Sequence, residues 1–257
     1  MNISQVVAQL YTLKGFTEDA AQIASALRRV RAMGYEAVQA SGLGPIEIAE
    51  LANILGGEGL ACVATHEPTD TILDEPEKVV DRLRALNCKY TAVPYPSGVD
   101  LSSASAVDEF IAKLDHAGRV LAEAGQVLCY HNHHVEFRKL DGEIILDRIF
   151  RRTDPRRLQG EIDTYWVQYG GGDSVAWCRK LKGRLPLIHL KDYRVDEENK
   201  VGYTDIGAGV LDFAAICAEA ENSGCEWFIV ERDPAPGDPF DSLKASYDYI
   251  KESIASH

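Results

Sequence analysis

The chain alternates between short apolar runs and longer amphipathic segments along its whole length. Eight runs are rich in Val, Ile and Tyr and have the length of buried strands. They occupy residues 6–13, 35–41, 60–66, 90–96, 127–134, 158–163, 185–192 and 226–233. The segments between these runs have helical patterns. In residues 18–34 the predicted apolar face contains Ala21, Ala24, Leu27 and Val30.

Glycine marks the junctions at which a helical segment ends and an apolar run begins. Gly34 and Gly224 stand at two such junctions, and glycine readily adopts the left-handed conformation that closes a helix. Strand–helix alternation repeated eight times predicts an α/β protein, most simply a closed (β/α)8 TIM barrel forming a single domain over residues 1–257. An open doubly wound sheet would usually carry a glycine-rich fingerprint after its first strand, and residues 11–16 are not one.

Charge and composition exclude several classes of protein. The 257 residues include 27 basic and 40 acidic side chains, and the net charge of −13 disfavours nucleic-acid binding. We expect no signal peptide and no membrane helix, because no apolar run reaches spanning length. The six cysteines form no CxxC pair, which is typical of buried thiols in a reducing cytoplasm. The sequence neither requires nor forbids a homodimer.

Four successive apolar runs end in side chains that can bind a metal ion: His131, Asp163, His189 and Glu231. Because strand side chains alternate between two faces, one consistent assignment points all four into a barrel mouth. Mixed imidazole and carboxylate ligation suits one divalent ion, and Mn²⁺, Co²⁺, Zn²⁺, Fe²⁺ and Mg²⁺ all remain open. A lone histidine on a strand is more often a hydrogen-bonded core residue, so the prediction rests on the set. Glu161 is a ligand, a partner of a histidine, or part of a buried ion pair.

At these residues the chain resembles the xylose isomerase-like barrel superfamily, which contains sugar and sugar-phosphate isomerases and epimerases, inosose dehydratases and endonuclease IV. The resemblance implies a single metal at the barrel mouth, with Asp163, His189 and Glu231 on the family's ligand positions after strands six, seven and eight. The matching segments are specific as an ordered set that spans nearly the whole chain: QLYTL (9–13), CVATHEP (62–68), YHNHHVEF (130–137), GEIDTYW (160–166), GRLPLIHLKDY (183–193), DIGAGVLDF (205–213) and WFIVERD (227–233).

Two positions depart from the family pattern. The strand-five ligand is ordinarily a glutamate, and His131 stands in its place. Isomerases and epimerases of the superfamily pair two glutamates across the substrate for proton transfer, so one of that pair is absent here. A histidine is also common three residues after the aspartate, where this chain has Trp166. The Tyr-His-x-His and His-Leu-Lys-Asp patterns look closer to the inosose dehydratase branch.

The resemblance also implies a reaction type. Enzymes of this superfamily typically act on a carbonyl next to a hydroxyl, through an enediolate that the metal stabilises. We expect Glu231 to be both a ligand and a substrate contact. His66, at the end of the third apolar run, is the first choice for a catalytic acid or base, and His133 is the second.

Other residues near the strand ends are candidates for substrate contacts. Lys191 could neutralise a developing oxyanion, and a salt bridge to Asp163 or Glu161 explains it equally well. Gly207 and Gly209 look like the family's substrate-closing loop, although a plain turn before a helix explains both. Three more side chains could meet an anionic group or line a sugar pocket, but are as a rule solvated or rim-packing residues: Arg194, Tyr11 and Trp166.

The leading hypothesis is a cytoplasmic, divalent-metal-dependent isomerase or epimerase of a sugar or sugar phosphate. The runner-up is a lyase that dehydrates a keto-polyol such as an inosose. The missing strand-five glutamate favours the lyase, whereas the breadth of the superfamily's isomerases favours the first hypothesis. An endonuclease IV-like phosphodiesterase needs a multi-metal cluster and a basic surface, which the net charge of −13 disfavours. A sugar-binding barrel without catalysis is the fourth alternative.

Overall fold

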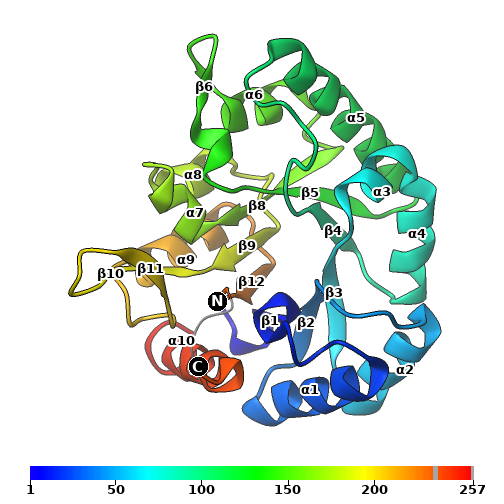
Figure 1. The fold of residues 1–257 in the computed structure, drawn as a ribbon, viewed down its shortest axis with the longest axis vertical. Helices are drawn as coiled ribbons and strands as arrows, with labels where there is room; N and C mark the ends of the chain where they lie inside the picture. Colours follow the sequence, from blue (N-terminus) through cyan, green and yellow to red (C-terminus); the bar gives the residue numbers. More distant parts are fainter. Residues whose placement is uncertain (234–236, 256–257) are drawn as a thin grey trace.

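Eight parallel strands form a closed barrel in the computed structural model, which describes residues 1–233 and 237–255 (Figure 1). The predicted fold is therefore confirmed, and each predicted apolar run supplies one barrel strand. The strands pair in chain order and the last pairs with the first: β1 (Val6–Gln9), β2 (Ala37–Ala40), β3 (Ala61–His66), β4 (Tyr90–Val93), β5 (Val127–His131), β8 (Leu158–Asp163), β9 (Leu187–Leu190) and β12 (Trp227–Val230).

Helices cover the outside of the barrel (Figure 1). They are α1 (Ala20–Met33), α2 (Ile48–Glu58), α3 (Thr69–Asp74), α4 (Pro76–Ala85), α5 (Ala104–Glu123), α6 (Ile145–Arg152), α7 (Thr164–Tyr169), α8 (Ser174–Lys180), α9 (Phe213–Asn222) and α10 (Pro239–Ser253), with 3-10 turns η1 (Ile3–Gln5), η2 (Leu10–Leu13) and η3 (Val135–Phe137). Among the described residues, no helix is both long and apolar enough to cross a membrane. All six cysteines are buried free thiols.

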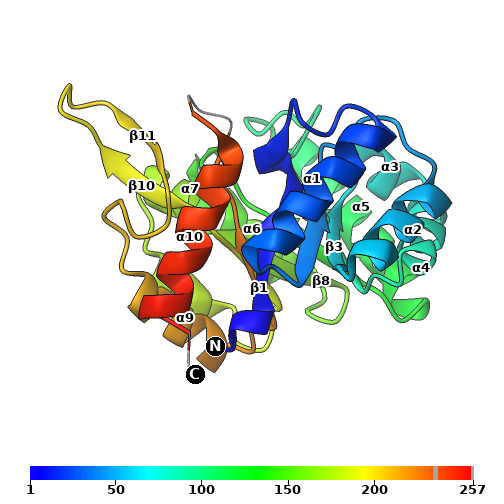
Figure 2. The same ribbon diagram turned by 90° about the horizontal axis from the view of Figure 1, so that it is seen from below.

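Two hairpins extend the mouth, the end of the barrel at which the strands finish. One pairs β6 (Lys139–Leu140) with β7 (Glu143–Ile144), and the other pairs β10 (Asp192–Val195) with β11 (Val201–Thr204). Figure 2 shows the second hairpin projecting away from the barrel, at the end opposite to the two chain termini. The sequence pattern predicts its longest irregular stretches at residues 193–209 and 233–238, and the hairpin, which begins at Asp192, forms in the first of them. Residues 234–236 of the predicted loop 233–238 lie outside the described residues.

Local details differ from the sequence prediction in the first strand and in the first helix. The first apolar run leaves the strand after Gln9, because residues Leu10–Leu13 turn into η2 with the Gln9 side chain as its cap. The buried face of α1 is made by Ile23, Ala26, Leu27 and Val30. The predicted face was therefore correct at Leu27 and Val30 but wrong at Ala21, which is exposed.

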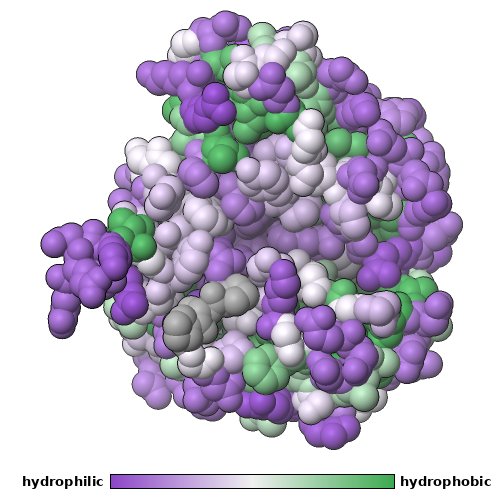
Figure 3. Space-filling model, viewed as in Figure 1, coloured by the Kyte–Doolittle hydropathy of each residue, from purple (hydrophilic) through white to green (hydrophobic). Residues whose placement is uncertain are grey.

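The interior of the barrel has an apolar layer below and a polar layer above. The apolar layer includes Val7, Ala37, Ala64, Cys129, Leu187 and Ile229. Side chains two positions further along a strand point to the same face, so each of these residues is followed by an inward polar side chain nearer the mouth. That polar layer contains Gln9, Gln39, His66, His131, His189 and Glu231. In the space-filling view, polar residues accordingly line the hollow at the centre of the mouth (Figure 3).

Close helix packing supports the barrel wall near the site. Gly118 lies within α5, and a Cβ added there would lie 2.1 Å from the carbonyl oxygen of Arg157, just before β8. Contacts this short force the backbone to move, and β8 carries two of the inward carboxylates. Gly56, in α2, has nothing within 4 Å of the same added atom.

We therefore expect Gly118→Ala to lower the free energy of unfolding by about 1–3 kcal/mol, the usual cost of overpacking. Gly56→Ala is the matched control, because it makes the same change in an open helical position and should be neutral or stabilising by about 0.5–1 kcal/mol. Urea titration followed by circular dichroism measures both. Equal effects of the two substitutions would show that the Arg157 contact is not close-packed.

Candidate metal centre and active site

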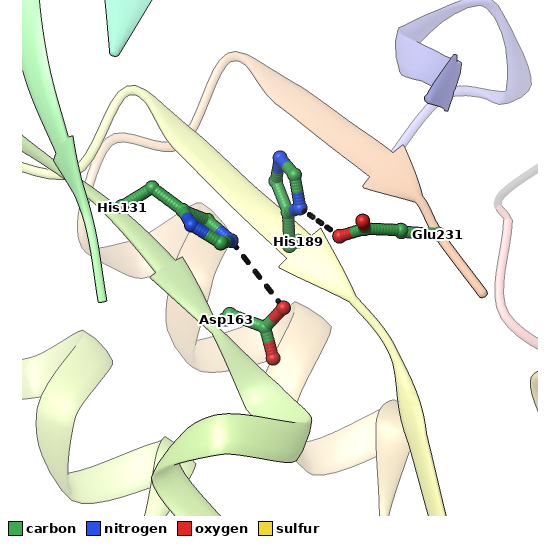
Figure 4. Close-up of side chains that lie close together, drawn as sticks. All are labelled: His131, Asp163, His189 and Glu231. Atoms are coloured by element: carbon green, nitrogen blue, oxygen red, sulfur yellow. Dashed lines mark hydrogen bonds and ion pairs between the residues drawn. The ribbon is translucent and has the colours of Figure 1, made fainter. Parts of the chain in front are cut away.

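The structure brings His131, Asp163, His189 and Glu231 together on the floor of the mouth (Figure 4). One ligand-type atom from each side chain lies within 4.8 Å of the others, and all four side chains are buried. The strands explain the convergence, because β5, β8, β9 and β12 are consecutive in the barrel. In the β8–β9 pair, Asp163 stands opposite His189.

Two atoms in this cluster have no hydrogen-bond partner. His131 Nε2 and Asp163 Oδ2 are buried and face one another 3.4 Å apart (Figure 4). Leaving a buried polar atom unpaired costs roughly 1–3 kcal/mol. A divalent cation among the four side chains would engage both atoms, and the mixture of imidazole and carboxylate donors suits such an ion. The residues present therefore fit a divalent metal.

Neighbouring backbone and side chains aim these two groups. Asn132 Oδ1 accepts a hydrogen bond from the Asp163 backbone N–H at 3.0 Å. Asp163 Oδ1 accepts from the backbone N–H of Trp166 at 2.9 Å and so caps α7, which leaves Oδ2 for the cluster. His131 Nδ1 lies 3.2 Å from the carbonyl oxygen of Pro94 and must donate to it. In the neutral tautomer with its proton on Nδ1, the lone pair of Nε2 points into the cluster.

Glu161 sets the hydrogen-bond directions beneath the cluster. Its buried carboxylate accepts from Gln39 Nε2 at 2.8 Å and lies 2.6 Å from His66 Nε2. Because an ionised carboxylate only accepts, Gln39 must turn its amide oxygen away from Glu161. That oxygen accepts from Gln9 Nε2 at 2.8 Å and lies 2.7 Å from His189 Nε2. Glu161 is therefore a direct hydrogen-bonding partner of His66 and is linked to His189 through the Gln39 amide.

The same chain of contacts fixes His189. Its Nε2 donates to the amide oxygen of Gln39, so its Nδ1 is the nitrogen that faces Glu231, 2.7 Å away. Burial alone lowers the pKa of His189, but without a bound cation the carboxylates of Glu161 and Glu231 raise it to about 10. A metal ion at Nδ1 would displace the proton from that nitrogen. Burial alone raises the pKa of Glu231, and the charges of Lys191 and His189 bring it well below its usual value.

His66 has a carboxylate behind it and the pocket in front. Its Nε2–H points to Glu161, and its Nδ1 lies 3.2 Å from the Ser41 hydroxyl. Burial lowers the pKa of His66, and the attraction of Glu161 partly offsets this effect. A histidine held on one nitrogen by a carboxylate has its other nitrogen oriented for proton transfer. His66, Glu161 and His189 also offer ligand atoms within 4.8 Å of one another, but the hydrogen bonds just described already engage those atoms.

Lys191 is a buried cation beside the cluster. Its Nζ lies 2.6 Å from Asp233, 3.8 Å from Glu231 and 4.0 Å from Asp163. Burial alone lowers its pKa, but these carboxylates raise it above the ordinary value, so the amine stays charged. The sequence predicted a salt bridge to Asp163 or Glu161 as the alternative role of Lys191. The shortest contact is instead made with Asp233, and Asp163 lies at 4.0 Å. The ammonium also lies over three aromatic rings, with centroids at 4.9–5.9 Å: Tyr203, Trp166 and Tyr165.

A pocket of about 280 Å³ opens above these groups. Its lining includes five residues that the sequence proposed for substrate contact or catalysis: Tyr11, His66, His133, Lys191 and Glu231. The ring of His133 lies 5.0 Å from that of Trp166, and His133 Nδ1 and Trp166 Nε1 are both buried without a partner. Burial lowers the pKa of His133 to about 2, so this imidazole is neutral.

The remaining predicted substrate residues lie elsewhere. Arg194 is on the β10–β11 hairpin and lines a separate surface cleft. The backbone N–H groups of Gly207 and Gly209 donate to the Asp192 carboxylate at 3.0 and 2.9 Å. A Cβ at Gly207 would meet the Tyr249 ring, and one at Gly209 would meet the Asp192 carboxylate. These glycines are therefore needed for internal packing of the loop.

Four residues that orient the site had no role predicted from the sequence: Gln9, Gln39, Ser41 and Asn132. The first two are fully buried amides inside otherwise apolar runs. A polar residue two positions after an inward apolar one was the signal that could have identified both.

Comparison with known proteins gives the same family as the fold and the site. The family model for the xylose isomerase-like TIM barrel matches residues 27–253. Inosose dehydratase from Geobacillus thermodenitrificans is 31% identical over 163 residues, which cover 57% of this chain and 54% of that protein. Inosose dehydratase from Lacticaseibacillus casei is 33% identical over 150 residues, covering 51% and 50% respectively. The aligned regions thus span about half the length of these curated relatives.

Solved structures agree over nearly the whole chain. A sugar phosphate isomerase/epimerase from Parabacteroides distasonis has a TM-score of 0.83 at 20% identity, covering 97% of this chain and 94% of that chain. A xylose isomerase-like TIM barrel protein from Mycobacterium smegmatis, in complex with magnesium, has a TM-score of 0.75 at 14% identity, covering 98% and 97%. These TM-scores show a shared fold, and the family model over residues 27–253 shows that the chain belongs to the xylose isomerase-like TIM barrel family.

Proposed function

We propose that this protein is a metal-dependent lyase that removes water from a keto-polyol, with isomerisation or epimerisation of a keto-sugar as the second candidate. The observation that carries the proposal is the convergence of His131, Asp163, His189 and Glu231, with Lys191 and His66 at the rim of the same small pocket. The sequence patterns alone favour the isomerase or epimerase. The curated relatives that are inosose dehydratases now support placing dehydration ahead of it.

Dehydration of a keto-polyol breaks two bonds. A base takes the proton from the carbon next to the carbonyl, and the hydroxyl on the following carbon leaves with a proton as water. A divalent ion held by the four ligand-type side chains would supply a Lewis acid for the carbonyl oxygen. The charged Lys191 supplies a second, fixed positive group for the oxyanion that develops there. Asp233 and the aromatic rings hold the ammonium in place.

His66 is the proposed proton carrier. Its burial favours the neutral form, which can accept a proton at Nδ1, the nitrogen on the side of Ser41 and the pocket. Glu161, on the opposite nitrogen, stabilises the imidazolium that results. The same imidazolium can then hand its proton to the departing hydroxyl, so one group serves both bond-breaking steps.

The residue at position 131 separates the two candidates. Epimerisation needs a proton-transfer group on each side of the reacting carbon, and among the four ligand-type side chains Glu231 is the only glutamate. Elimination needs one base whose proton leaves with water. The solved isomerase/epimerase neighbours support the second candidate through the fold alone, because they are only about 20% identical.

Removal and return of divalent metal tests the proposed centre. We expect the chelator-treated protein to gain about 5–10 °C in Tm at a metal concentration a hundredfold above Kd, because binding to the folded state stabilises it by about 2.7 kcal/mol. Asp163→Asn should abolish most of this gain, since it removes the charge of the carboxylate whose Oδ2 has no hydrogen-bond partner. Calorimetric scans with Mn²⁺, Co²⁺, Zn²⁺ and Mg²⁺ provide the measurement.

Asp241→Asn is the matched control for that experiment. Asp241 is exposed on α10, away from the cluster, and its variant should bind metal as the unchanged protein does. If metal stabilises the Asp163 variant as much as the control, the four side chains do not form the proposed metal centre.

Product analysis separates the two candidate reactions. With 2-keto-myo-inositol in D₂O, proton NMR should show a dehydrated product that has lost one hydroxyl, whereas isomerisation or epimerisation keeps every hydroxyl. Appearance of a rearranged or epimerised ketose without loss of water would place the second candidate first.

Replacement of His66 tests its role in proton transfer. His66→Gln should lower kcat by about 10²–10⁴, the usual contribution of general acid–base catalysis, while metal binding persists. His116→Gln is the control, because His116 is exposed on the outer face of α5. A His66 variant with unchanged kcat would assign proton transfer to another group.

A further inference from the structure

A second cavity adjoins the active-site pocket. It has a volume of about 500 Å³, against about 280 Å³ for the pocket itself. The two share four lining residues: Tyr11, Ser41, His66 and Pro94. The second cavity lies beside the connections that follow β1, β2 and β3, and its outer wall includes Leu43, Ile46 and Arg82. We call it the side compartment.

The wall of the side compartment is closely packed. A Cβ on Gly42 would lie 2.6 Å from the Tyr11 ring, so only a glycine at this position allows the ring to approach the loop so closely. A Cβ added to Gly44 would lie 2.1 Å from the carbonyl oxygen of Glu18. The Gly44 N–H donates to the carbonyl oxygen of Thr17 at 2.8 Å. Two glycines at contact distance therefore fix the loop of residues 41–46 in the shape that leaves the compartment open.

The charge of the side compartment favours an uncharged occupant. Its one cationic lining residue, Arg82, donates to Glu67 at 2.7 Å, and both line the compartment. The pair has no net charge, so a phosphate or carboxylate gains little there. The remaining lining includes Leu43, Pro45 and Ile46, which offer apolar surface to a ligand.

His66 lies at the boundary between the two cavities. It lines both, and its Nδ1 and the hydroxyl of Ser41 are 3.2 Å apart on their shared wall. A substrate that filled both cavities would pass this histidine at the link between its two parts. The proposed proton carrier would then stand next to an oxygen that joins them.

We propose that the natural substrate has two parts: a keto-sugar in the pocket and a neutral, partly apolar group in the side compartment, joined through a glycosidic oxygen. The inference rests on the proposed lyase activity and extends it. The proton leaves the carbon next to the carbonyl, the bond from the following carbon to the glycosidic oxygen breaks, and that oxygen departs with a proton as an alcohol. The atoms balance without an oxidant or reductant, because the alcohol takes the place of water.

Three substrates with leaving groups of similar acidity test this proposal. A glycosidic oxygen on C1 requires the carbonyl at C3, so the probes are 3-keto-D-glucose, its methyl β-glycoside and its 2-phenylethyl β-glycoside. We expect kcat/KM for the 2-phenylethyl compound to exceed that for the free sugar at least about tenfold, mainly through KM, since the phenyl group buries apolar surface. Chromatography of the released alcohol follows the reaction.

A filled compartment should remove that preference. Ile46→Trp should lower the ratio of kcat/KM for the 2-phenylethyl glycoside over the free sugar about tenfold. Val99→Trp is the matched control, because Val99 lines a neighbouring cleft that contains neither Tyr11 nor His66, and it should leave the ratio unchanged.

The outcomes distinguish the two proposals. Equal kcat/KM for the three keto-glucose compounds overturns the two-part substrate, and so does dehydration of 2-keto-myo-inositol without release of alcohol from either glycoside. In both cases the lyase activity stands. If neither 2-keto-myo-inositol nor any keto-glucose compound loses water or alcohol with any of the four metals, the proposed function fails, and the two-part substrate fails with it.

Discussion

The hydrogen bonds of one buried carboxylate orient the polar side chains beneath the mouth of this barrel. Glu161 can only accept, so it fixes the amide of Gln39, and the Gln39 oxygen in turn requires a proton on Nε2 of His189. On its other side the same carboxylate holds His66 and turns the free nitrogen of that ring toward Ser41. One acceptor therefore orients a candidate metal ligand and a candidate base at once. Such directional networks tolerate little change, because each buried group depends on the next for its partner.

The barrel and the convergence of the four ligand-type residues followed from the sequence because both depend on periodicity. A strand that is apolar at one inward position and polar two residues later must present the polar group at the mouth. His131, Asp163, His189 and Glu231 lie at the ends of four strands that are consecutive in the closed sheet, so their convergence needs only the strand order.

Features that depend on contacts between distant segments could not be read in the same way. Gln9 and Gln39 look like isolated polar residues until β1 and β2 lie side by side and place the two amides 2.8 Å apart. The loop with Gly207 has the composition of a ligand-binding turn, but its N–H groups are used by Asp192. Ala21 of α1 was wrongly predicted to be buried, because steps of three residues drift away from one face of a helix with 3.6 residues per turn. The observed buried residues from Ile23 to Val30 follow the i, i+3, i+4, i+7 spacing.

A shared cation among four buried side chains is the central claim of this account, and crystals grown with Mn²⁺ test it most directly. An anomalous difference map should contain one strong peak at coordinating distance from His131 Nε2, Asp163 Oδ2, His189 Nδ1 and Glu231, because the two unpaired atoms face this point. A map with no peak there, or with its strongest peak elsewhere on the molecule, would contradict the account.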